Sequence, residues 1–291
     1  VPYVEQTFGA WHLGGGLATL AVALADRLSQ RHVDLRLNTE VERITTVAGR
    51  VTGVRLTSGE HLAADIVVAN ADAGTVYGRL IDDPAAERPL RELTSATPSF
   101  GGFVLLLALR GRTPGLAHHN VWFPADYDAE FDAVFGTRAE PAHPAWDPTV
   151  YVCSPDDPQM RPDADHESWF VLVNAPRHGN DRGAIDWRAP GLADDYADRV
   201  LAVLAERGCD VRDRIYWREV RTPADLQDSA AAPGGAIYGT SSNGVRAAFL
   251  RPSNASPVSG LYLVGGSAHP GGGLPLVGMS AEIVANLIGR S

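Results

Sequence analysis

The chain has 291 residues, a formal net charge of −10 and an apolar fraction of 45%, which allows one large or two medium domains with a sizeable core. The acidic balance argues against a nucleic-acid-binding surface. All 25 basic residues are arginine, so lysine-based Schiff-base chemistry and a Walker-type phosphate loop are excluded. The two cysteines, Cys153 and Cys209, lie far apart without a CxxC pattern, which is typical of small buried residues in a cytoplasmic protein.

The chain shows no pattern for crossing a membrane or for secretion. Its longest strongly apolar run, Phe103 to Leu109, is much shorter than the ~20 residues that span a bilayer. No N-terminal signal pattern is present. The chain begins with Val1 instead of methionine, from which we expect that it is part of a longer chain.

Apolar periodicity predicts an α/β arrangement in the first quarter of the chain. Leu17, Leu20, Leu24 and Leu28 share one face at helical spacing, which favours an amphipathic helix over residues 17–30. Alternation of apolar and polar residues between turn signals then indicates short strands. We place these strands at 33–37, 41–47, 50–57 and 61–69, followed by a helix at 74–81. The last strand, "DIVVANA", is continuously apolar, as in a strand buried on both faces.

The middle of the chain is predicted to be rich in strands. Strands are expected at 100–110, 149–155 and 168–176, the last two paired, with loops and short elements at 118–148. A helix at 192–207 ends at Gly208, and a strand with a short helix follows. We expect one domain formed by residues 1–92 and 233–291, interrupted by a second domain at 93–232.

The stretch "GLYLVGGSAHPGGGLPLVGMSAEIVANLI", residues 260–288, joins an apolar strand to an apolar helix through a glycine cluster. Glycine lets a ligand approach the main chain, and a helix N-terminus offers unpaired N–H donors. The junction is therefore either a tight, closely packed turn or a seat for a carbonyl edge or a phosphate. His269 within it is either a structural turn residue or a catalyst.

Three stretches together resemble the bacterial carotenoid (phytoene) desaturase family of FAD-dependent oxidoreductases. They are "GAWHLGGGLATLAVALADRL", the run from "LRLNTEVERI" to "ADIVVANAD", and the glycine-rich end, and they cover residues 8–82 and 235–291. The end segment most resembles the carotenoid 3,4-desaturase branch. The resemblance implies an α/β (α+β) fold in which an incomplete FAD-binding Rossmann-like domain is interrupted by a β-sheet-rich substrate-binding domain with helices.

The resemblance also implies a bound FAD that accepts a hydride from an isoprenoid C–H bond. Gly265, Gly266 and Ser267 would follow the ribityl and pyrophosphate side of the flavin. The residues that would pass along the isoalloxazine ring are His269, Pro270, Gly271, Gly272, Gly273, Leu274 and Pro275. Val41 matches the position whose backbone meets the adenine, and the turn at 14–16 would pack near the flavin.

One part of the family pattern is missing from this chain. Such desaturases open with a strand, a GxGxxG turn and a helix that hold the FAD pyrophosphate, followed by a ribose-binding Glu. Gly14, Gly15 and Gly16 lack the later glycine and do not follow a buried strand. We therefore expect the C-terminal half to two-thirds of a desaturase, which binds FAD poorly or not at all by itself.

Other candidate constellations are interpreted as structural. His118, His119 and His143 could ligate a metal, but neighbouring histidines on a strand point to opposite faces, so we expect a solvated loop and no metal site. The serines of "GTSSNG", residues 239–244, lack a nucleophile pattern. Acidic residues at 126–132 and 194–198 are expected on exposed helix faces. Five aromatic residues could line an apolar tunnel or belong to the core: Trp122, Phe123, Trp169, Phe170 and Trp187.

The leading hypothesis is a carotenoid desaturase-type flavoprotein acting on an isoprenoid or carotenoid. A lipid-soluble substrate implies peripheral contact with a membrane surface, although no basic amphipathic helix stands out for it. Two alternatives stay open. One is a catalytically silent apo fragment or isoprenoid-binding module, and the other is an amine-oxidase-like flavoenzyme with a polar aromatic cage for a soluble substrate.

Overall fold

The computed structural model describes residues 2–241 and 251–289. Helices α1 to α8 run Pro2–Phe8, Ala18–Gln30, Ala73–Thr75, Glu87–Ser95, Tyr127–Phe135, Leu192–Glu206, Pro223–Ala230 and Leu274–Ile288. Strands β1 to β12 run Val41–Val47, Arg50–Leu56, His61–Ala63, Val67–Ala69, Gly101–Arg110, His119–Trp122, Val150–Cys153, His166–Ala175, Arg177–His178, Ala184–Ile185, Ile215–Arg221 and Leu261–Leu263. A π-helical turn, Val76–Leu80, continues α3. The chain thus has the mixed α/β class that the sequence predicts.

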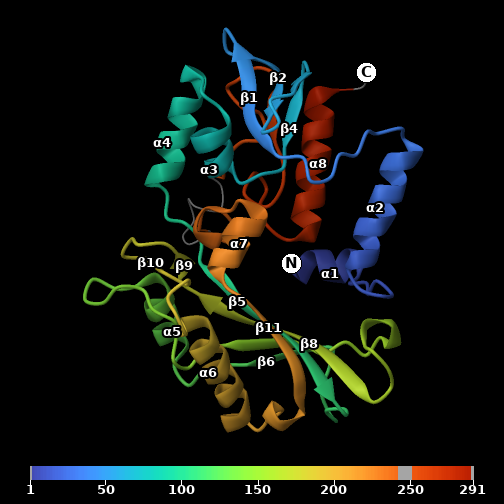
Figure 1. Ribbon diagram of the computed structural model, residues 1–291, viewed down its shortest axis with the longest axis vertical. Helices are drawn as coiled ribbons and strands as arrows, with labels where there is room; N and C mark the ends of the chain where they lie inside the picture. The colour runs from blue at the N-terminus through green and yellow to red at the C-terminus, as the bar shows by residue number, and fades with distance from the viewer. Residues whose placement is uncertain (1, 242–250, 290–291) are drawn as a thin grey trace.

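A five-stranded antiparallel sheet forms the lower half of the molecule in Figure 1, in the order β11-β5-β8-β7-β6. β5 and β8 pair over ten residues, from Gly101 opposite Ala175 to Arg110 opposite His166. Helix α6 packs on this sheet through its apolar face, where Tyr196, Val200 and Leu204 are buried. This sheet and helix enclose the larger hydrophobic core.

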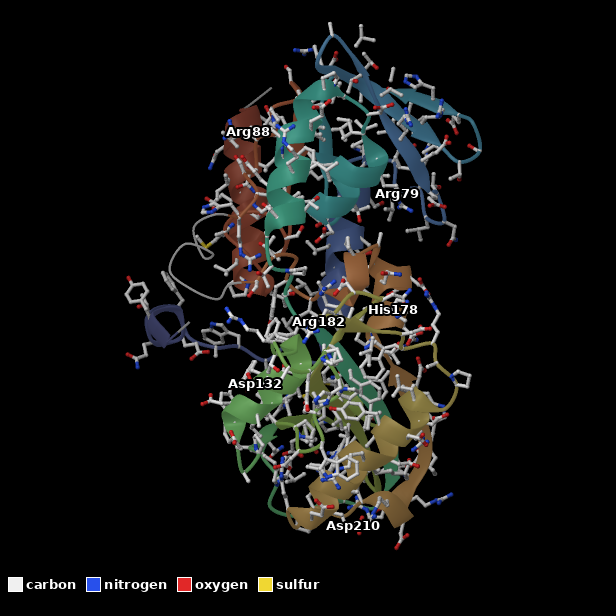
Figure 2. The ribbon with its side chains drawn as sticks, turned by 90° about the vertical axis from the view of Figure 1, so that its left-hand side faces the viewer. Arg79, Arg88, Asp132, His178, Arg182 and Asp210 are labelled. Carbon is white, nitrogen blue, oxygen red and sulfur yellow. The ribbon has the colours of Figure 1, made fainter. Side chains whose placement is uncertain are left out.

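A second core lies in the upper half, between the three-stranded antiparallel sheet β1-β2-β3, the parallel pair β12-β4 and helix α3. Its buried members include Ile44 and Val51 of the hairpin and Leu261 and Leu263 of β12. The segment just before β12 docks on the hairpin, where the amide of Val51 donates to the carbonyl of Ser259 at 2.9 Å. The two cores lie at opposite ends of the molecule, with Arg88 of α4 far from Asp210, which lies in the segment after α6 (Figure 2). The domain boundaries at 92/93 and 232/233 stay a prediction.

Most predicted elements appear within a few residues of their expected bounds, but two strands differ. Residues 33–37 form no strand, because no neighbouring strand pairs with them and both His32 and Asn38 have positive φ. The strand predicted at 61–69 is two strands separated at Ala64–Ile66. β3 completes the hairpin sheet and β4 pairs with β12. The alternation of apolar and polar residues could not show that the two halves of this segment pair with different strands.

Two helices carry apolar side chains that the described residues leave exposed. No residue of α2 is buried, and Leu24 is 57% exposed. In α8 only Ser280 and Val284 are buried. The apolar face of α2 is thus present, as predicted, but is not packed against the described part of the chain. None of the described helices combines the length and apolarity needed to cross a bilayer.

Candidate functional site

The candidate site is the carboxyl edge of the parallel pair β4 and β12. In register, Leu261 faces Val67 and Leu263 faces Ala69, so both strands end at the same edge. β4 leads into Asn70-Ala71-Asp72, and β12 leads into the glycine loop, residues 264–273, which ends at α8. In open α/β sheets, ligands bind beyond the carboxyl ends of parallel strands.

Side chains from neighbouring segments hold the glycine loop in place. The amide nitrogen of the Asn254 side chain lies 3.0 Å from the carbonyl of Leu263, 2.9 Å from that of His269 and 3.0 Å from the hydroxyl of Ser280. The Arg251 guanidinium donates to the carbonyl of Gly266 at 3.0 Å. These bonds satisfy buried carbonyls and fix the path of the loop.

Several glycines of the loop are explained by contacts within the chain. A Cβ at Gly265 would lie 2.4 Å from the Asn70 side-chain oxygen, and one at Gly272 would lie 2.3 Å from the ring of Tyr238. A Cβ at Gly273 meets nothing within 4 Å, yet its φ of 99° favours glycine. The tight-turn interpretation therefore accounts for Gly265 and Gly272, and open space lies next to the loop at Gly273 and in a pocket lined by Gly266 and Ser267.

Helix α8 begins at the open end of the glycine loop, after Gly273. Gly273, the residue before the helix, provides no side-chain cap, and Pro275 has no N–H. The amides of Leu274 and Leu276 make no hydrogen bond within the described residues, and both side chains are exposed. Two N–H donors and the positive end of the helix dipole thus face the surface.

Asp72 lies at the same edge and was not singled out from the sequence. It lines two adjoining pockets of about 260 and 160 Å³ together with Ser267. Its carboxylate accepts from the amide of Gly74 at 2.8 Å, and the Ser267 hydroxyl accepts from the amide of Ala73 at 3.1 Å. Burial raises the pKa of Asp72 above its ordinary value, against the lowering effect of its hydrogen bonds from Gly74, Thr75 and Ser267. Its place directly after the predicted strand was the available signal, although β4 is only partly buried, with Val68 45% exposed, so the expected burial on both faces was wrong.

The other predicted site residues lie as follows. The exposed His269 ring forms no hydrogen bond or ion pair with any residue that the structure describes, so no group here orients it as an acid or base. Val41 starts β1 in the hairpin sheet, which is separate from the β4/β12 pair. The turn at 14–16 packs against Asp157, Gln159 and Met160 of the lower half. Residues 242–244 of "GTSSNG" lie outside the described residues.

Of the interpretations of the middle segment, one was confirmed in part and two were wrong. Trp169 and Trp187 belong to the larger core, as one of the two alternatives held, and Trp122 packs against it. Phe123 and Phe170 are exposed, so the five aromatic residues do not line one tunnel. Glu130 is buried and accepts hydrogen bonds from Thr149 and Asn174, so it is not on an exposed face.

The adjacent histidines do not point to opposite faces either. The rings of His118 and His119 lie 4.5 Å apart, because His118 precedes the strand that begins at His119. His143 lies apart from them and faces Glu140 at 3.9 Å.

Comparison with known proteins places the chain in a family. The family model for flavin containing amine oxidoreductase matches residues 3–288. The chain is 34% identical over 99% of its length to a 4,4'-diapolycopene oxygenase of Methylomonas sp., and 36% identical over 96% to a hydroxyneurosporene desaturase of Rubrivivax gelatinosus. It covers 56% and 52% of these two proteins, so it spans about half the length of the curated relatives it matches.

Two solved structures share the fold of this chain. An oxidoreductase from Methanosarcina mazei aligns with a TM-score of 0.57 at 17% identity, over 93% of this chain and 54% of that one. A putrescine oxidase variant aligns with a TM-score of 0.55 at 14% identity, over 95% of this chain and 53% of that one. At such identities the likeness shows the fold alone. The chain belongs to the flavin containing amine oxidoreductase family, as a member of its carotenoid desaturase group that spans about half the length of its relatives.

Proposed function

We propose that this chain forms the flavin-ring and substrate side of an FAD-dependent carotenoid desaturase. The observation that carries the proposal is the uncapped N-terminus of α8, at the end of the glycine loop that leaves the carboxyl edge of β4 and β12. The two pockets lined by Asp72 and Ser267 lie at the start of the same loop. The relatives named for carotenoids, among them a 1-hydroxycarotenoid 3,4-desaturase of a Flavobacterium species, indicate the substrate class.

The residues present fit one part of FAD. The free amides of Leu274 and Leu276 suit the electron-rich carbonyl edge of an isoalloxazine ring, because N–H donors and the helix dipole favour partial negative charge. No GxGxxG unit for the pyrophosphate occurs in the printed sequence. The fit thus extends to the ring side of the cofactor, and we expect weak binding by this chain alone.

When bound, FAD supplies the redox chemistry: it accepts a hydride from an allylic C–H bond of the polyene, while a proton leaves the adjacent carbon. The role of this chain is to orient the reactants. The α8 amides hold the acceptor edge, and Asn254 fixes the loop that carries them. Asp72 contacts the glycine loop through Ser267, and its raised pKa makes it a better proton acceptor than an ordinary Asp.

A matched pair of variants tests the proposal. Leu274→Pro removes one N–H donor at the first helical position, where proline is tolerated, and Gly273 before it already has a ψ of 140°. Leu274→Ala keeps the donor and removes the side chain. FAD affinity, measured by flavin absorbance after gel filtration and by fluorescence titration, should fall roughly 2- to 12-fold in the proline variant only. Equal affinities in both variants would refute the placement of the ring.

The same titration distinguishes the alternatives. Flavin retained in stoichiometric amount supports the enzyme and would sink the apo-fragment alternative. Colourless protein that binds a carotenoid in lipid vesicles supports an isoprenoid-binding module, which the exposed apolar side chains of α2 and α8 favour. Desaturase activity itself is read from the red shift of carotenoid absorption as each conjugated double bond is added.

A further inference from the structure

Two histidines and a cysteine converge at one end of the five-stranded sheet, away from the glycine loop. The antiparallel register of β6 and β7 sets His119 directly opposite Cys153. His118 lies one residue before β6, and its carbonyl accepts from the amide of Ser154 at 2.9 Å. One potential ligand atom from each of these three side chains lies within 4.8 Å of the other two.

A local turn explains how His118 reaches the cluster. The Asn120 side chain accepts from the amide of Ala117 at 2.9 Å and donates to its carbonyl at 2.7 Å. This pair of hydrogen bonds folds the chain back just before β6. His118 therefore lies in a turn, where the alternation of side chains along a strand does not apply. Both imidazoles therefore reach the same side as the Cys153 thiol.

The surroundings suit metal ligation. The Nδ1 atom of His119 lies 2.7 Å from the Tyr151 hydroxyl, a contact that fixes the ring and leaves Nε2 available. A third imidazole, His12, lies 5.2 Å from the His118 ring between centroids, and its Nε2 atom is 2.9 Å from the Asp157 carboxylate. Histidine ligands in metal sites commonly pair their second nitrogen with a carboxylate or another oxygen in this way.

We propose that His118, His119 and Cys153 form a binding site for a transition-metal ion of the Zn²⁺ class, with His12 next to the fourth coordination position. Two imidazoles and a thiolate are ligands that Zn²⁺, Co²⁺ and copper ions prefer, whereas Mg²⁺ and Ca²⁺ prefer oxygen. Zn–N and Zn–S bonds of 2.0–2.3 Å place tetrahedral ligand atoms roughly 3.5 Å apart, so ligation needs the side chains to close by about 1 Å. Partial burial of His118 and Cys153 and exposure of His119 leave a path for the ion. This site does not depend on the proposed flavin function.

Cobalt is the probe for this site. Chelator-treated chain titrated with Co²⁺ should bind one equivalent and develop thiolate-to-cobalt charge-transfer absorption in the near ultraviolet, which Zn²⁺ then displaces. Cys153→Ser should abolish that absorption, and His119→Ala should weaken Co²⁺ binding at least tenfold. Tyr151→Phe, which removes the contact to His119 Nδ1, should weaken binding roughly tenfold without loss of the charge-transfer band.

Matched controls come from the same chain. Cys209→Ala changes the other cysteine, which is buried in the larger core, and His143→Ala changes an exposed histidine outside the cluster. Both should keep the wild-type Co²⁺ spectrum and affinity. The proposal is overturned if saturating Co²⁺ gives the wild type no charge-transfer band, or if the band persists in Cys153→Ser and disappears in Cys209→Ala.

Discussion

Three glycines near the start of α8 should respond to alanine in three different ways. A Cβ on Gly272 would lie 2.3 Å from a ring carbon of Tyr238, more than 1 Å inside the ~3.5 Å of a normal carbon contact. Gly272 does not have a positive φ, so the clash is the only cost. Overpacking of this kind costs about 1–3 kcal/mol, which we expect as the loss in free energy of unfolding for Gly272→Ala.

The other two glycines distinguish the energetic cost of backbone conformation from the cost of steric contact. Gly273→Ala meets no atom within 4 Å but places alanine at a φ of 99°, which should cost roughly 1–2 kcal/mol. Gly278→Ala lies inside α8 with open space around it and should stabilise the chain by about 1 kcal/mol, through helix propensity. Urea unfolding followed by far-ultraviolet circular dichroism measures all three changes.

A double-mutant cycle tests the cause at Gly272. In a Tyr238→Ala background the ring is absent, so Gly272→Ala should cost less than about 0.5 kcal/mol, while the cost of Gly273→Ala should not change. The reasoning fails if Gly272→Ala costs as much without the ring as with it. That result would mean that the loop needs glycine for a reason other than its packing on Tyr238.

Three further variants test individual side chains. Asp72→Asn keeps the side-chain oxygen that caps Gly74 but cannot ionise. Because the pKa of Asp72 is raised in the folded state, the stability of the wild type should fall as pH rises from the ordinary Asp pKa through the raised one. The variant should lack that fall when unfolding is measured as a function of pH. Glu130→Ala leaves the buried donors of Thr149 and Asn174 without an acceptor and should lower the free energy of unfolding in urea by about 3 kcal/mol. Asp132→Ala, at an exposed position of the same helix (Figure 2), is the control and should change stability by less than about 0.5 kcal/mol. Asn254→Ala leaves the carbonyls of Leu263 and His269 without its amide and should cost about 1–3 kcal/mol in thermal unfolding. Ala at the exposed Asn180 is the matched control and should change stability by less than about 0.5 kcal/mol.

Elements with strong local signals were predictable from the sequence. The apolar run of β5 is bounded by glycine and arginine, α6 has a full amphipathic period before Gly208, and α8 has a proline in its first turn. The false strand at 33–37 shows the limit of such signals, since alternation marks a strand only where another strand pairs with it. The same limit applies at β4, whose partner β12 is almost 200 residues away in the chain.

The candidate site was predictable only in part, for the same reason. The sequence places the glycine loop between a strand and a helix, and the structure has it there. The contact of Asp72 with Ser267 joins segments far apart in the chain, and the His118, His119 and Cys153 cluster depends on the register between β6 and β7. Both groupings are tertiary, so neither residue spacing nor periodicity could indicate them.

The sequence allowed the glycine loop to be either a closely packed turn or a ligand-binding junction, and the loop has features of both. Glycines at 265 and 272 are required because Asn70 and Tyr238 occupy the space of a side chain, so these positions support a closely packed turn whatever the chain binds. Residues 273–276 combine open space, unbonded amides and a helix N-terminus, whereas Gly266 and Ser267 line a pocket without a helix N-terminus. If a flavin ring binds here, its contacts should therefore concentrate on these four residues. Variants at 265 or 272 would change affinity only by disturbing the fold, with stability and FAD binding lost together, whereas Leu274→Pro should lower affinity and leave stability almost unchanged.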